Sequence, residues 1–111
     1  MSLQSYQNRV HDEQLGDSFF VTKTASCTLK PYEKFVNLDS SGGSTALTFN
    51  LPPVAEMCGE MIVLYVTGYD GAITIAAADS VDFSAPTFDG ADDGALLYSD
   101  GVHWWTLAVR T

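Results

Sequence analysis

The chain has 111 residues, the size of one domain, and 46% of them are hydrophobic, so the chain can bury a core. Its net charge is −9, and no Lys or Arg stands between Phe35 and Val109, where ten carboxylates occur. Nucleic acids and anionic membranes both require cationic contacts. The composition therefore excludes nucleic-acid and membrane-surface binding, and the acidic body keeps copies of itself soluble.

The first sixteen residues (MSLQSYQNRVHDEQLG) are polar and show neither a helical nor a strand period. Such a segment buries too little apolar surface to fold by itself. We therefore predict an extended N-terminal docking arm over residues 1–16 and a single β-domain over 17–111. With no apolar signal-peptide region near Met1, we expect synthesis in a reducing cytoplasm. The arm residues expected to contact a partner are Leu3, Tyr6, Arg9, Val10 and Leu15.

Short runs rich in Thr, Val, Ile and aromatic residues follow the arm, and turn residues separate them. In Leu47–Leu51 and in Ile73–Ala77 every second residue is apolar, as in a strand with one buried face. Met61–Thr67 is apolar on both faces, which predicts a central strand. Asp79–Gly94 is predicted to be a loop that could contain a short strand near Phe83 or Phe88. The other strands and turns are expected at Phe19–Lys23, Ala25–Lys30, Lys34–Leu38, Asp39–Ser44 (turn), Tyr69–Gly71 (turn), Leu96–Tyr98, Ser99–Gly101 (turn) and Val102–Val109.

About seven short strands at close spacing predict an all-β fold, specifically a small antiparallel β-sandwich or barrel. Long stretches of helix-forming residues are missing. No internal repeat is convincing.

Two polar loops invite a catalytic or metal-binding interpretation. Asp39–Gly43 (DSSGG) resembles the loop around a protease serine, but a triad also needs a positioned histidine, and a Gly/Ser-rich turn explains the same residues. The loop Asp89–Gly94 follows part of the calcium-loop pattern, yet Ala91 stands where a ligand oxygen is required. We expect no enzyme activity, no catalytic residue, no cofactor and no metal. A cation would have to be held by Asp89, Asp92, Asp93 and Asp100.

The densest aromatic cluster is His103-Trp104-Trp105. Adjacent strand residues point to opposite faces, so the tryptophans cannot form one flat platform for a sugar. One should fill the core and the other should face a partner. His103 should be a partly exposed residue on the side of Trp105. Residues assigned to an oligomer face are Tyr65, Trp104 and Trp105; a carbohydrate-binding module remains an alternative that rests on the tryptophans alone.

The two cysteines, Cys27 and Cys58, are far apart in the sequence. We expect both to be buried as small hydrophobic residues, because free cysteine is among the most buried residue types. The sequence leaves their redox state open.

Two segments, Leu47–Val66 (LTFNLPPVAEMCGEMIVLYV) and Ala95–Leu107 (ALLYSDGVHWWTL), resemble small β-domains of tailed-bacteriophage virion proteins. Such domains occur on head decoration proteins and on tail fibres and carry no catalytic residues. The resemblance implies a capsid decoration or cement protein, a homotrimer bound to the major capsid protein on the virion surface and made in the host cytoplasm. A tail-fibre or baseplate domain for receptor attachment is the alternative.

Overall fold

The computed structural model describes residues 20–43, 45–80 and 82–111. These described residues form eight strands and one short 3-10 turn, η1 (Val54–Met57). The strands are β1 (Phe20–Lys23), β2 (Cys27–Thr28), β3 (Phe35–Asp39), β4 (Leu47–Asn50), β5 (Met61–Gly68), β6 (Ile73–Ala76), β7 (Gly94–Ser99) and β8 (Trp104–Arg110).

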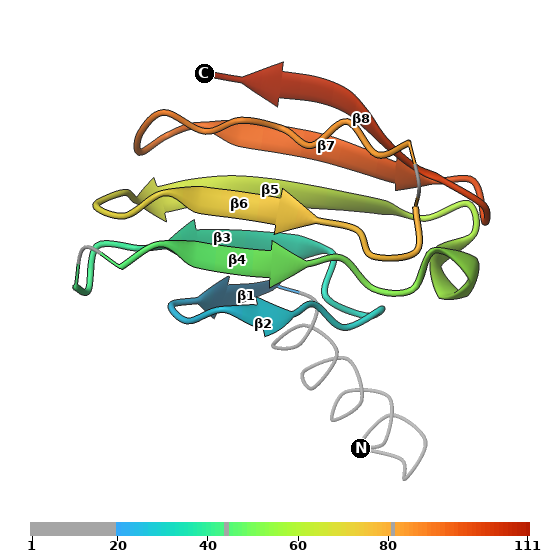
Figure 1. The fold of residues 1–111 in the computed structure, drawn as a ribbon, viewed down its shortest axis with the longest axis horizontal. Coiled ribbons are helices and arrows are strands. Elements are labelled where there is room, and N and C mark those ends of the chain that lie inside the picture. Colours follow the sequence, from blue (N-terminus) through green and yellow to red (C-terminus); the bar gives the residue numbers. More distant parts are fainter. Residues whose placement is uncertain (1–19, 44, 81) are drawn as a thin grey trace, which may run out of the picture.

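The strands form two sheets, one with the order β1-β3-β5-β7-β8 and one with the order β2-β4-β6. Figure 1 shows β2, β4 and β6 in front of β1, β3 and β5. Consecutive strands up to β6 alternate between the sheets, so the chain coils, and each turn adds one strand to each sheet. The pairs β1–β3, β3–β5, β2–β4 and β4–β6 are therefore parallel, and only β5–β7 and β7–β8 are antiparallel.

The all-β prediction is confirmed, but the expected antiparallel sandwich or barrel is wrong for most of the chain. The physical reason is that a period of two marks a strand with one buried face and carries no information about the direction of its neighbour. Neighbouring strands among β1, β3 and β5, and among β2, β4 and β6, run parallel because the chain returns through the opposite sheet between them. After β6 the chain re-enters the five-stranded sheet in the other direction, so β7 is antiparallel to β5.

The core lies between the two sheets. The inward residues Leu47 and Phe49 of β4 and Ile73 and Ile75 of β6 are buried, as their alternation predicts. The central position expected for Met61–Thr67 is also confirmed, since β5 is the third of five strands. The five-stranded sheet contributes Val36, Leu38, Ile62, Leu64, Val66 and Leu97 to the same core.

The turns that join the sheets are tied to one another. The Ser40 hydroxyl, after β3, donates to the carbonyl of Gly71 at 2.7 Å and accepts from the Gly71 and Asp70 N–H groups. A Cβ on Gly71 would lie 2.2 Å from the Thr45 carbonyl oxygen, so only glycine fits there. Ser40, the buried residue of the DSSGG segment, thus links two turns of the coil, and the residues after it in the segment form an exposed turn.

The chain between β6 and β7 covers the inner side of β7 and β8, which the three-stranded sheet does not reach (Figure 1). Phe88 is buried there, Tyr69 donates its hydroxyl to the Phe88 carbonyl, and Thr106 donates to the Ser84 carbonyl. No strand forms at Phe83 or Phe88. Among the described residues no helix is long and apolar enough to cross a bilayer.

Candidate functional site

The outer side of the five-stranded sheet carries an unbroken apolar row. Strand pairing places Phe20, Phe35, Val63, Leu96 and Ala108 side by side, one from each strand. These residues alternate with the buried core positions, so their side chains point away from the core. The Phe20 and Phe35 rings stack with their centroids 6.3 Å apart. The row therefore crosses the full width of the sheet.

Two further rows lie beside the first. Met61, Tyr98 and Trp105 form one of them, and Met61 and Trp105 are 49% and 45% exposed. The other row consists of Thr22, Asn37, Tyr65, Gly94 and Arg110. The thirteen residues of these three rows are called the outer face below. Large exposed apolar patches on a soluble domain typically mark a surface that another molecule covers.

The outward side of the three-stranded sheet differs sharply in composition. Its residues are Thr28, Thr48, Asn50, Thr74 and Ala76. Hydroxyl and amide groups suit contact with water, so this side needs no cover. The contrast makes the outer face of the five-stranded sheet the candidate binding surface.

Two aromatic side chains of the outer face are held at their polar tips by carboxylates at its rim. The Tyr65 hydroxyl donates to Asp92 at 2.5 Å, and this hydrogen bond raises the pKa of Tyr65. The Trp105 indole N–H donates to Asp100 at 2.9 Å. Donation from the His103 backbone N–H, and next from Trp105, lowers the pKa of Asp100 to about 2. Both rings are thereby fixed in position with their donors already satisfied.

Two shallow apolar hollows flank Tyr65. One, of about 360 Å³, lies toward β1 and includes Phe20, Phe35 and Val63 in its lining. The other, of about 380 Å³, lies toward β8 and includes Leu96 and Ala108. The outer face is therefore a surface of ridges and hollows on which side chains of a partner can be seated.

The predicted oligomer-face residues divide between core and surface. Tyr65 and Trp105 lie on the outer face, whereas Trp104 is 1% exposed and packs in the core. Trp104 is therefore corrected from a partner-binding to a core residue, although the expected division between one buried and one exposed tryptophan is confirmed. His103 contacts Trp105 edge-on at 5.8 Å, as expected. The outer-face residues missed from sequence include Phe20, Phe35, Leu96 and Tyr98.

Three of the four carboxylates considered as cation ligands serve separate structural roles. Asp93 is buried and accepts from the backbone N–H groups of Asp89 and Gly90. Asp92 binds Tyr65, and Asp100 caps the turn before β8 by accepting from the backbone of Val102 and His103. Among residues 20–43, 45–80 and 82–111, no three His, Cys, Asp or Glu side chains are placed to hold a metal ion.

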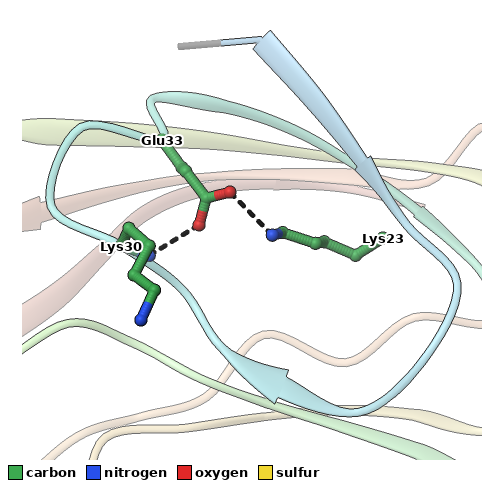
Figure 2. Close-up of polar contacts among 3 residues, drawn as sticks. All are labelled: Lys23, Lys30 and Glu33. Carbon is green, nitrogen blue, oxygen red and sulfur yellow. Dashed lines mark hydrogen bonds and ion pairs between the residues drawn. The ribbon is translucent and has the colours of Figure 1, made fainter. Parts of the chain in front are cut away.

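A second buried carboxylate, Glu33, ties the first turn of the coil together (Figure 2). One of its oxygens lies 2.7 Å from the Lys23 ammonium group, and the other accepts from the Lys30 backbone N–H at 2.6 Å. The Glu33 hydrogen bond raises the pKa of Lys23 against the opposing effect of burial. This group joins the end of β1 to the loop before β3, and its role is to stabilise the fold.

The cysteines are free in the structure, with Cys27 half-buried and Cys58 exposed. The expectation that both are buried is wrong for Cys58, which lies just after η1 rather than on a strand. Its thiol donates to the Asp100 carbonyl at 3.6 Å.

The predicted arm residues Leu3, Tyr6, Arg9, Val10 and Leu15 lie outside the described residues. No protein-family model matches the sequence, and no curated protein or solved structure is significantly similar to it.

Proposed function

We propose that this chain is a non-enzymatic structural protein that functions by binding protein surfaces on an assembled phage capsid. The observation that supports a role in protein–protein contacts is the apolar outer face, on which Phe20, Met61 and Trp105 are exposed. Aromatic residues and methionine are enriched in protein interfaces, and charged residues are depleted from their centres. Both properties describe this face.

The groups that could perform acid–base chemistry support the same proposal, because they have structural partners. Glu33 is paired with Lys23, and Asp93 binds backbone N–H groups in its own loop. Asp100 holds Trp105 and the turn before β8. Each of these carboxylates already stabilises a local structure.

The capsid enters the proposal through the sequence resemblance. The segments Leu47–Val66 and Ala95–Leu107, which resemble phage virion β-domains, supply Met61, Tyr65 and Trp105 to the outer face. A protein that binds only an assembled shell stabilises that shell by mass action. The acidic body facing solvent would keep decorated particles from associating.

We further propose that residues 1–16 dock on the capsid. Fully extended, sixteen residues reach roughly 50 Å, which is enough to contact more than one capsid subunit. The arm contains one cation and sparse apolar residues among hydrogen-bonding side chains. A segment that becomes ordered only on docking binds weakly per contact over a wide surface.

Deleting residues 1–16 tests this function. We expect the truncated chain to keep its melting temperature, because the core consists of residues from Leu29 to Trp104. Its affinity for purified particles of the encoding phage, measured by co-sedimentation, should fall at least about tenfold, or about 1.4 kcal/mol. A chain with residues 1–16 in scrambled order is the matched control and should bind as poorly as the truncated one. Equal binding by full and truncated chains would show that the arm has no docking role, and failure of the full chain to sediment with capsids would contradict the proposed function.

A further inference from the structure

We infer that the outer face packs against the outer face of a second copy of this chain. The inference names what covers this face, and it holds whether or not the chain decorates a capsid. Outer faces come together both in a dimer and in the homotrimer expected from the sequence resemblance. The measured mass distinguishes a dimer from a trimer.

The distribution of charge favours a second copy. The segment Phe35–Val109 carries ten carboxylates and neither Lys nor Arg, so most approaches of two copies bring like charges together. The three rows of the outer face contain none of these carboxylates, and Arg110 is their one charged residue. The rows of the outer face are therefore an apolar surface on which two acidic bodies can meet, with the carboxylates Asp92 and Asp100 kept to its rim.

The chemistry of the face is self-complementary. Phe20, Met61 and Trp105 are exposed apolar side chains, and the hollows on either side of Tyr65 have apolar linings that can receive such groups. The Tyr65 hydroxyl and the Trp105 indole already donate to Asp92 and Asp100, so they need no acceptor from a partner. The same sheet of a second copy can pack against this surface with its exposed side chains in the hollows, as in sheet-on-sheet packing.

The area of the face is sufficient for a stable interface. Five strands at about 4.8 Å spacing span about 24 Å, and the eight residues of β5 span about 26 Å. The other four strands are shorter, with four to seven residues, so two such faces in contact bury on the order of 1,000 Å² in total, about the area expected of a specific interface with good complementarity.

Light scattering on the full chain at micromolar concentration tests the inference. We expect a mass of two or three times that of the 12.0 kDa chain. Phe35→Glu places a charge in the central row of the face and should reduce the mass to that of one chain. Thr74→Glu introduces the same charge at an exposed position on the other sheet and should leave the oligomer intact.

A monomeric wild-type chain would overturn the inference, and so would an oligomer that survives Phe35→Glu with a native circular dichroism spectrum. If Phe35→Glu fails to fold, Met61→Glu replaces it, because Met61 is 49% exposed at the start of β5.

Tryptophan quenching of the unmodified protein gives an independent readout. Trp104 is buried within the chain, whereas Trp105 is 45% exposed on the outer face. Acrylamide quenching should therefore increase on dilution, as Trp105 becomes accessible when the copies separate. Quenching that stays the same from high micromolar to nanomolar concentration would count against the packing of these faces.

Discussion

Replacing Trp104 by alanine should lower the free energy of unfolding by about 3–5 kcal/mol, the cost of removing a large aromatic side chain from a packed core. Its side chain is 1% exposed, and its indole N–H donates to the Pro52 carbonyl at 3.1 Å. The substitution therefore creates a cavity and leaves a buried carbonyl without its donor. For a domain of this size such a loss is a large part of the total stability.

Trp105→Ala is the matched control, one residue away on the opposite side of the same strand. It removes an exposed side chain and one hydrogen bond to Asp100, so it should cost less than about 1 kcal/mol. Urea unfolding at the lowest workable concentration measures both variants without a contribution from association. Equal losses for the two variants, or a larger loss for Trp105→Ala, would contradict the assignment of core and surface.

Glu33→Gln should lower the free energy of unfolding by about 2–3 kcal/mol, because it removes the charged partner of Lys23 from a buried site. The Glu33 side chain is 4% exposed, and it also accepts from the Lys30 backbone N–H (Figure 2). Glu60→Gln is the control. Glu60 forms an ion pair with Lys34 but is 51% exposed, so its replacement should cost less than about 1 kcal/mol.

The pH dependence of this loss identifies the lysine as the partner. Glu33 raises the pKa of Lys23 above its ordinary value of 10.5. A raised pKa in the folded state gives stability that is fully present below pH 10.5 and is lost as the pH rises through the folded-state pKa. The difference in stability between wild type and Glu33→Gln should thus be constant near neutral pH and shrink above pH 10.5. A difference that grows with pH, or an equal loss in Glu60→Gln, would show that the ion pair is not the cause.

The strands and their buried faces could be predicted from the sequence, because the alternation at Leu47–Leu51 and Ile73–Ala77 is set by the core. The direction of neighbouring strands could not, since the same alternation fits a parallel or an antiparallel partner. The predicted strand Ala25–Lys30 shortens to Cys27–Thr28. There the chain leaves the sheet for the loop that carries Lys30 and Glu33.

The outer face could be predicted only in part. Tyr65 and Trp105 can be recognised in the sequence as aromatic residues on predicted strands. That they share a face with Phe20 and Phe35 follows only from strand pairing across the sheet. The burial of Glu33 could not be predicted from the sequence, because a glutamate between Tyr32 and Lys34 is ordinarily exposed. Its partner Lys23 comes close only when the first turn of the coil forms.

A low-resolution map of the virus particle that contains this chain tests the central claim most directly. We predict density for the β-body on the outside of the capsid, in clusters of copies whose five-stranded sheets face one another. The acidic remainder of each body should face solvent. Density for the chain at the tail, or bodies on the capsid whose outer faces remain exposed to solvent, would contradict the account.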